Sequence, residues 1–485
     1  MNKSNLSPSC VFDQFKQINQ IPRPSKHEEK MVEYLKEFAK KHGLDVKVDA
    51  VNNVNIRKPA TPGYENRKVV ILQSHTDMVC DKLVDVEFDF NKDAIQSYVD
   101  GEWLKAKGTT LGADDGIGVA MQLAVLESND IEHGPLECVF TSDEETQMTG
   151  ASGMERGFMT GDWLINLDSE DEGEIFVSCA GGRSTHAVFH FEKEEAPKGH
   201  FFLQISVKGL TGGHSGDDIN KKRANAIKLL TRFVYLEQEK YDVRLASFNS
   251  GKLHNAIPRD GRVVIAVPND VKENVRADWN VFAHEVADEF YVTDTAMEFA
   301  MESVNVEKVM PADVGRRIIM ALQGITNGVF AICQDPALGG MVETSSNIAV
   351  VKTTDNTVDL LASQRSNVMS NLTNQCNAVG AVLKLAGAEV EQTDGYPAWQ
   401  MNPNSELTKL AIESYKRLFN KEPIVRGIHA GLECGQFATS YPGMDMVSFG
   451  PTLRDVHTPD ERLLIPTVQM VWDHLLDILK NVPAK

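Results

Sequence analysis

The sequence lacks the features that mark membrane proteins and nucleic-acid-binding proteins. No apolar run reaches about 18 residues, the length that a membrane-spanning helix needs, and the N-terminal stretch has no apolar signal core. Basic residues are fewer than acidic ones, which gives a formal net charge of -20. An acidic surface repels phosphate backbones. We therefore expect neither a membrane nor a nucleic acid as a partner.

Cysteine is sparse and unpatterned. The seven cysteines are scattered along 485 residues, and none forms a C-x-x-C pair. An odd number of cysteines in a long chain is typical of a reducing compartment with mostly buried thiols. The sequence therefore predicts a cytoplasmic protein, and it contains no low-complexity tract or internal repeat.

The length and the 42% hydrophobic content exceed what one ordinary core accommodates, so we expect two domains. Short apolar runs bounded by turn signals occur near both ends of the chain: "KVVILQSH", "PLECVFTSDEE", "DWLINLDSED" and "GMDMVSFGP". Runs of this kind are typical of buried parallel strands. A small-residue helix, "DDGIGVAMQLAVLES", follows the first run. The pattern predicts an α/β domain with a mixed, largely parallel sheet flanked by helices.

The middle of the chain has a different pattern. "HFFLQISVKGL", "GRVVIAVP" and "TVDLLASQRS" alternate with period two, and helical segments lie between them. We therefore predict an inserted α+β domain over residues 183–388. Residues 1–182 and 389–485 would then form the two parts of the first domain.

One helix near the N-terminus carries local start and stop signals. We predict it over residues 25–43, with Ser25 and Glu28 as a capping box and Gly43 as the stop.

Acidic residues and a histidine follow the apolar runs, where ligands of open α/β sheets bind. These candidates are His75, Asp77, Glu144, Glu145 and Asp168, and a further candidate, Asp114, lies just before the small-residue helix. Each alone has an ordinary explanation as a satisfied strand end, a helix N-cap or a solvated loop. Together at one sheet edge the carboxylates would repel each other, and one or two divalent cations would relieve that repulsion. Imidazole and carboxylate without thiolate suit zinc, manganese or cobalt.

The spacing within this set suggests separate roles. His75 and Asp77 share a face if the backbone is extended, so Asp77 is placed to hold the second ring nitrogen of His75. Glu144 and Glu145 are adjacent and point in different directions, so one can bind a metal while the other acts on a water. The sequence therefore suggests a hydrolytic apparatus.

These motifs carry a resemblance to a known family. "SHTDMV", "GTTLGADDGIG", "TSDEE", "NLDSEDEGEI", "GGHSG" and "HTPDE" occur in the order found in the dinuclear zinc exopeptidases of the carboxypeptidase-G/aminoacylase group. Within this family the chain is most similar to the dipeptidases, through "HNAIPRD" and "HAGLECG" as well. The resemblance implies a zinc-exopeptidase-type catalytic domain and an inserted lid domain.

The resemblance also implies a set of metal ligands for two Zn²⁺ ions per chain, which Co²⁺ or Mn²⁺ can replace. Asp114 would bridge the two ions, His75 and Asp168 would complete one site, and Glu145 and His457 would complete the other.

Further roles follow from the same resemblance. Glu144 would be the general base that deprotonates the bridging water, and Asp77 would orient His75. A cis peptide bond is expected after Asp114. Asp115 stands where the dipeptidases often carry Asn, and the added charge would alter metal affinity.

The inserted domain would supply the substrate contacts. His214 would stabilise the oxyanion, although a lone turn histidine is usually structural. Asn255 and Arg365 would hold the substrate's free carboxylate, and Gly431 would contribute a backbone contact. Family members pair through this domain, which implies a homodimer.

The expected activity is hydrolysis of unblocked dipeptides, including Xaa-His dipeptides such as carnosine. Two alternatives lie within the family: an aminotripeptidase and an aminoacylase-like deacylase. A remote alternative is a non-catalytic binding protein that retains the fold.

Overall fold

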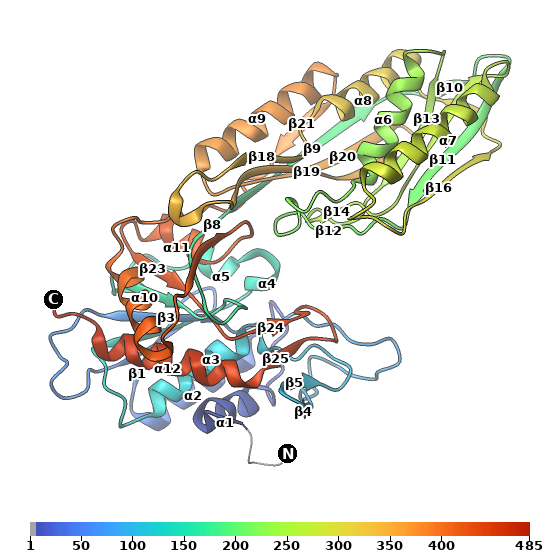
Figure 1. Ribbon diagram of the computed structural model, residues 1–485. Coiled ribbons are helices and arrows are strands. Elements are labelled where there is room, and N and C mark those ends of the chain that lie inside the picture. The colour runs from blue at the N-terminus through green and yellow to red at the C-terminus, as the bar shows by residue number, and fades with distance from the viewer. Residues whose placement is uncertain (1–5) are drawn as a thin grey trace. The chain divides into compact units, whose positions relative to one another are not determined.

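The computed structural model describes residues 6–485, which divide into two compact units (Figure 1). Unit 1 comprises the described residues through Ser178, together with Trp399–Gly427 and Leu432–Lys485. Unit 2 comprises Cys179–Ala398 and Ile428–Gly431. The chain therefore leaves unit 1, builds unit 2 and returns.

The boundaries of unit 2 differ from the 183–388 segment that the sequence pattern suggests. Gly182 N–H donates to the carbonyl of Tyr396 at 3.0 Å, and Tyr396 N–H donates back to Gly182 at 2.9 Å. Ala180 N–H donates to the carbonyl of Ala430 at 3.0 Å. These backbone bonds keep residues up to 398 and residues 428–431 with unit 2, although neither segment has the alternating pattern of the strands.

Unit 1 is built on a mixed sheet whose central strands β6, β3, β7 and β23 are mutually parallel. In spatial order the strands are β1 (Asp45–Val48), β2 (Val54–Lys58), β6 (Leu136–Thr141), β3 (Val70–His75), β7 (Trp163–Asn166), β23 (Asp445–Ser448), β8 (Glu174–Cys179) and β22 (Ile424–Ile428). The residues of β3, β6 and β7 are buried, as expected for continuous apolar runs.

Helices cover the sheet of unit 1, with α3 packed on β3 and α10 packed on β23. The helices of this unit are α1 (Ser9–Ile18), α2 (Glu29–His42), α3 (Ala113–Glu127), α4 (Glu144–Gln147), α5 (Thr149–Gly153), α10 (Glu406–Phe419), α11 (Cys434–Ser440) and α12 (Ile465–Asn481). A smaller sheet contains β24 (Leu453–Arg454), β25 (Arg462–Leu464), β5 (Trp103–Ala106) and β4 (Ser97–Asp100). This arrangement confirms the predicted α/β layer.

Unit 2 is an antiparallel sheet with helices on one face (Figure 1). In spatial order its strands are β16 (Glu298–Ser303), β11 (His200–Lys208), β15 (Gly261–Pro268), β13 (Arg244–Ser250), β19 (Val342–Thr353), β20 (Thr357–Ser366), β9 (Gly181–His190) and β21 (Glu389–Gln392), and β18 (Gly328–Ile332) pairs with β19. Short pairs join β10 (Glu194–Glu195) to β17 (Lys308–Val309) and β12 (Gly213–His214) to β14 (Ala256–Ile257).

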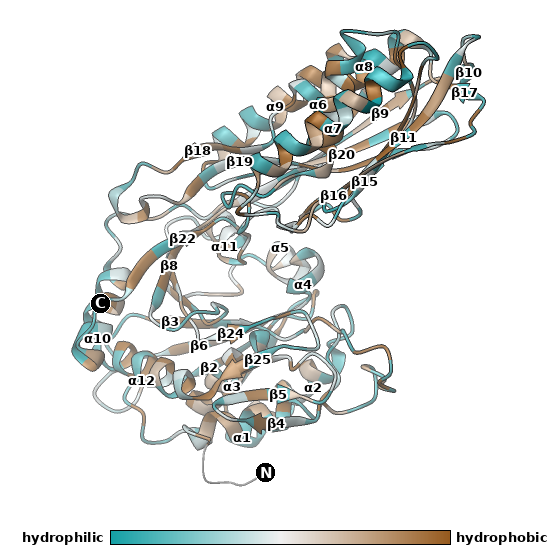
Figure 2. Ribbon diagram, turned by 45° about the vertical axis from the view of Figure 1, so that its right-hand side comes forward, coloured by the Kyte–Doolittle hydropathy of each residue, from teal (hydrophilic) through white to brown (hydrophobic). Residues whose placement is uncertain are grey.

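The helices of unit 2 carry the apolar stripe that amphipathic helices need to pack on a sheet. They are α6 (Ala226–Gln238), α7 (Lys272–Glu289), α8 (Ala312–Gly324) and α9 (Met369–Leu385), and a 3₁₀ turn covers Pro336–Leu338. Figure 2 shows hydrophobic and hydrophilic residues alternating along these helices. Phe233, Trp279 and Phe282 are among their residues in one buried cluster with strand residues such as Ile265 and Leu360. Unit 2 therefore has its own core, as the α+β prediction requires.

The N-terminal helix prediction was wrong at its start. Helix α2 begins at Glu29 and ends against Gly43, which adopts a left-handed conformation. The predicted capping box is absent, because Ser25 donates to Asp77 at 2.8 Å and Glu28 accepts from the Lys26 and Asp143 backbone N–H groups at 2.8 and 3.0 Å. These two side chains support a neighbouring loop instead of the helix.

Two further features bear on the sequence expectations. Among residues 6–485, no helix is long and apolar enough to cross a membrane. Four of the seven cysteines (138, 179, 376 and 434) are buried, in line with the expectation of mostly buried thiols.

Candidate metal centre and active site

Three parallel strands of unit 1 deliver the candidate residues to one edge of the sheet. The register aligns His75 of β3 with Thr141 of β6, and Gln73 of β3 with Asn166 of β7. Asp77 and Asp168 lie on the loops that follow β3 and β7, and Glu144 and Glu145 begin helix α4 after β6. Residues far apart in the sequence are thus brought together because parallel strands end at the same edge.

Asp114 lies at the centre of the cluster. Its Oδ1 atom is 3.1 Å from His75 Nε2, and its Oδ2 atom is 3.1 Å from His457 Nε2. Asp168 Oδ1 lies 3.4 Å from the same His75 nitrogen, and Glu145 Oε2 lies 3.0 Å from the same His457 nitrogen. One carboxylate therefore faces two separate groups, each made of one imidazole and one further carboxylate.

This donor set fits divalent cations. Ligand atoms of His75, Asp114 and Glu145 lie within 4.8 Å of one another. Glu145 Oε1 is buried and has no hydrogen-bond partner among residues 6–485, so it remains an open acceptor. Nitrogen and oxygen donors without thiolate suit zinc, manganese or cobalt.

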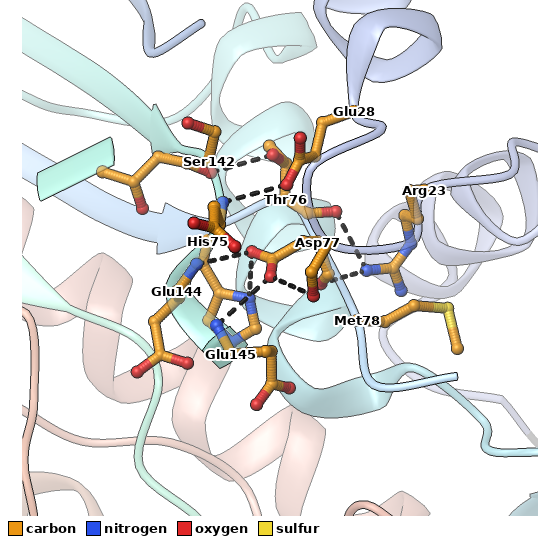
Figure 3. A network of polar contacts seen from close by, with 12 residues as sticks. Arg23, Glu28, His75, Thr76, Asp77, Met78, Ser142, Glu144 and Glu145 are labelled. Atoms are coloured by element: carbon orange, nitrogen blue, oxygen red, sulfur yellow. Dashed lines mark hydrogen bonds and ion pairs between the residues drawn. The ribbon is translucent and has the colours of Figure 1, made fainter. Parts of the chain in front are cut away.

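Asp77 connects the histidine to the loop that carries the two glutamates. Its Oδ1 atom is 3.3 Å from His75 Nδ1, the ring nitrogen that faces away from Asp114. The backbone N–H groups of Glu144 and Glu145 donate to the two Asp77 oxygens at 3.0 and 3.2 Å. Figure 3 shows the side chains of Glu144 and Glu145 extending on the same side of this network. Asp77 therefore sets the ring orientation of His75 and the position of helix α4 together.

A second acidic group, Glu28, Asp77 and Asp143, lies beside the first and is fully buried. Its oxygens already accept hydrogen bonds. Glu28 holds the Asp143 N–H at 3.0 Å, and the hydroxyls of Thr146 and Thr149 donate to Asp143. These bonds shape the loop that leads into Glu144.

Burial and mutual repulsion shift the pKa values of the cluster. Burial raises the pKa of Glu144 and Asp168 well above the usual range, and nearby carboxylates add to the effect. Burial opposes charge on Asp114 as well, but His457 and His75 lower its pKa. Burial also opposes protonation of His457, yet Asp114 and Glu145 outweigh it and raise its pKa to about 11. Without cations the site therefore holds protons that divalent ions would displace.

Two buried residues that the sequence reading missed hold the loop before Asp114. Glu461 accepts the backbone N–H groups of residues 111, 112, 113 and 114 at 2.7, 2.9, 2.8 and 3.3 Å. Arg23 donates to the carbonyl of Asp77 at 2.8 Å and also to that of Gly112. Glu461 belongs to the "HTPDE" motif, but nothing in the pattern indicates which backbone it binds.

Asp115 and Glu433 are further buried carboxyl groups near the centre. The peptide bond between Asp114 and Asp115 is cis, as the resemblance implied. Burial raises the pKa of Asp115 to about 8, which favours the uncharged form of this carboxyl group. Burial raises the pKa of Glu433 to about 7, and its Oε2 atom accepts from Gln73 at 2.6 Å and Thr141 at 2.8 Å.

The remaining predicted residues belong to unit 2. His214 lies on β12, Arg365 lies on β20, and His214 Nε2 is 3.4 Å from Arg365 Nη2. Asn255 immediately precedes β14, which pairs with β12, and its carbonyl accepts the Ser215 N–H at 2.8 Å. Gly431 closes the 428–431 segment of the same unit. Unit 2 thus brings His214 and Arg365 together.

Comparisons with known proteins agree along the whole chain. The profile of peptidase family M20/M25/M40 matches residues 71–481. Cytosol non-specific dipeptidase of Escherichia coli (strain K12) is 44% identical over 483 residues, which cover 99% of each chain. The crystal structure of aminoacylhistidine dipeptidase from Vibrio alginolyticus is 42% identical with a TM-score of 0.90, over 100% of this chain and 99% of that one. A tripeptidase from Staphylococcus aureus has the same fold at 17% identity and a TM-score of 0.57, over 99% of each chain.

The pKa shifts predict how cations and pH act on stability. Glu433, Asp115 and His457 have pKa values raised by folding, so the stability they contribute is lost as pH rises through about 7, 8 and 11. Folding lowers the pKa values of Asp77 and Asp114, so the stability that these two groups contribute is lost as pH falls, but only below about pH 4.

We therefore expect the metal-free protein to be less stable at pH 8 than at pH 6. A divalent cation at about 100 times its pH 6 dissociation constant should restore about 2.7 kcal/mol at pH 6. The same cation concentration should have a larger effect at pH 8, because fewer protons compete with the cation for the ligand atoms. Thermal unfolding with and without Zn²⁺ or Mn²⁺ at both pH values measures this. An equal or smaller cation effect at pH 8 would contradict the charge assignment.

Glu461→Gln should weaken metal binding about 10- to 100-fold, because an amide NH₂ would face backbone N–H donors and release the loop that carries Asp114. Competition with a chelating dye measures the affinity. Glu237→Gln is the matched control, since Glu237 is 1% exposed but binds Lys240 in unit 2. Unchanged metal affinity in Glu461→Gln would contradict the role of this loop.

Proposed function

The chain belongs to peptidase family M20/M25/M40, and on this basis we propose that it is a metal-dependent dipeptidase acting on unblocked dipeptides, including Xaa-His dipeptides such as carnosine. Identity of 44% over 99% of both chains to a dipeptidase supports the substrate class. The observation that carries the reaction is Asp114, whose two oxygens face two imidazole–carboxylate groups in unit 1.

We propose that His75 and Asp168 hold one Zn²⁺, that Glu145 and His457 hold a second, and that Asp114 bridges the two. Co²⁺ and Mn²⁺ have the same preference for nitrogen and oxygen donors and can substitute. When bound, such ions lower the pKa of a water molecule and polarise a carbonyl group. Asp77, 3.3 Å from His75 Nδ1, keeps the ring in the orientation that presents Nε2.

Glu144 is the proposed general base. Its backbone is anchored on Asp77, which also supports His75, whereas the neighbouring Glu145 places its side chain against His457, at 3.0 Å. Burial raises the pKa of Glu144 well above its usual range, which suits a group that first takes a proton from water and then gives it to the leaving amine.

Residues of unit 2 supply the substrate contacts in this proposal. Arg365 and Asn255 hold the free carboxylate, His214 donates to the oxyanion, and Gly431 offers backbone groups. Arg365 is 8% exposed and forms no ion pair with a carboxylate among residues 6–485. Asp217 lies within electrostatic range of Arg365 but pairs directly with His214 at 3.3 Å, so the buried guanidinium has no direct ion pair within the described chain and favours an anionic ligand.

We also propose a cytoplasmic homodimer. Strand β18 pairs only with β19 among the described strands, and its outer edge is open. Val329, Phe330 and Ile332 on this strand are 37%, 56% and 39% exposed. An exposed apolar edge strand favours pairing with a second chain, and an isologous contact closes a dimer.

Glu144→Gln should lower kcat for Leu-His by about 10²- to 10⁴-fold, because the amide cannot take the proton, while metal content is retained. A dipeptide assay with a metal count tests this. Glu145→Gln is the matched neighbour and should lose metal from the His457 side. Metal loss in Glu144→Gln would mean that the two glutamates have exchanged roles.

The wild-type substrate range tests the assigned activity. Wild-type enzyme loaded with Zn²⁺ should cleave Leu-His and carnosine. Cleavage restricted to tripeptides or to N-acyl amino acids would move the chain to those activities of the family. A protein that binds less than one metal per chain and hydrolyses none of these substrates would be a non-catalytic binding protein.

Phe330→Asp should shift the protein from dimer to monomer, because a charge on the open edge opposes strand pairing. Light scattering coupled to size-exclusion chromatography measures the mass. Leu385→Asp is the control, since Leu385 is 87% exposed on helix α9 and is not part of β18. A monomeric wild type, or a dimeric Phe330→Asp, would contradict the proposed interface.

A further inference from the structure

The surroundings of Arg365 contain a residue with no role so far. Tyr396 Oη accepts a hydrogen bond from Arg365 Nη1 at 2.7 Å, the shortest polar contact of this guanidinium. His214 Nε2 lies 3.4 Å from Nη2, and Arg365 Nε has no partner among residues 6–485. The phenol therefore fixes one end of a buried guanidinium that keeps a donor available.

Strand register explains how Tyr396 reaches Arg365. On the paired strands β20 and β9, Arg365 lies directly opposite Gly182. Gly182 exchanges two backbone hydrogen bonds with Tyr396, at 3.0 and 2.9 Å. The three residues thus lie side by side across neighbouring backbone segments, with Gly182 between the arginine and the tyrosine.

The absence of a side chain at Gly182 allows the Tyr396 ring to reach Arg365. A Cβ atom at Gly182 would lie 2.6 Å from both Cζ and Oη of Tyr396. Real side chains do not approach that closely, so any larger residue would displace the phenol. Gly182 is buried and Tyr396 is half-buried. The phenol ring therefore lies against the backbone of β9 at a position that has no side chain.

We propose that Tyr396 is a positioning residue that holds the Arg365 guanidinium and thereby sets the preference for substrates with a free C-terminal carboxylate. This inference rests on the proposed dipeptidase function and on Arg365 as the carboxylate contact. A free arginine side chain populates many rotamers, and the phenol removes that freedom before the substrate binds. One Nη1 N–H group is donated to the phenol, so the substrate carboxylate receives hydrogen bonds from the remaining donors of the guanidinium.

Tyr396→Phe should raise KM for Leu-His about 10-fold and leave kcat within about twofold, because the ring remains and only the hydroxyl is lost. For the C-terminal amide Leu-His-NH₂, KM should not change. Gly182→Ala should reproduce the effect, since it displaces the same hydroxyl, and the double variant should add nothing further. Tyr64→Phe is the control, because Tyr64 donates to Glu132 at 2.9 Å on the surface of unit 1.

Binding gives a readout that does not depend on turnover. Calorimetry should show that Tyr396→Phe weakens L-histidine but not L-histidinamide. A wild type that cleaves Leu-His while Tyr396→Phe keeps the same KM would overturn this inference alone. Equal losses for acid and amide, or a loss confined to kcat, would also overturn it. A wild type that does not cleave Leu-His would overturn the proposed function. In that case the calorimetry still tests Tyr396, because an L-histidine affinity that Tyr396→Phe leaves unchanged would overturn its role.

Discussion

Asp114 offers one carboxylate oxygen to His75 and the other to His457, each at 3.1 Å, and it does so in a nearly buried setting. Two further carboxylates, on Asp168 and Glu145, lie against the same imidazoles. So many ionisable groups in so little solvent are costly unless positive charge is shared among them. The loop that carries this carboxylate is correspondingly held by buried polar groups of unit 1.

The support for Asp114 comes from polar groups that are themselves buried. Glu461 takes the N–H groups of four successive residues, so the loop before Asp114 is held by its backbone rather than by side-chain packing. Arg23 binds carbonyls of both this loop and the Asp77 loop, which joins the bridging carboxylate to the support of His75. Buried networks of this kind are rigid because any displaced member would leave an unsatisfied group.

Unit 2 also contains a buried charged group held by polar side chains, but here the group is a cation. Arg365 is a buried cation whose contacts are a phenol and an imidazole. Burial also lowers the pKa of the nearby His429 to about 3, with Arg365 contributing, so this imidazole stays neutral. The guanidinium is thus left with unused capacity for an anion, in contrast to the arginines of the surface, many of which pair with carboxylates.

The places where local sequence rules fail coincide with the site. Ser25 and Glu28 have the spacing of a capping box, but Ser25 binds Asp77 and Glu28 binds the Asp143 loop. A helix cap contributes about 1 kcal/mol, and the buried carboxylate network outweighs it. Functional sites are where such conflicts between local and global requirements are expected.

The α/β and α+β classes of the two units could be predicted from the sequence, and so could the candidate ligands, because strand periodicity and strand ends are local properties. Three features could be seen only in the folded chain: which Asp114 oxygen faces which imidazole, the hold of Glu461 and Arg23 on its loop, and the contact of Tyr396 with Arg365 across Gly182. Those contacts join residues up to 350 positions apart. They depend on strand register and backbone path, and a one-dimensional pattern contains neither.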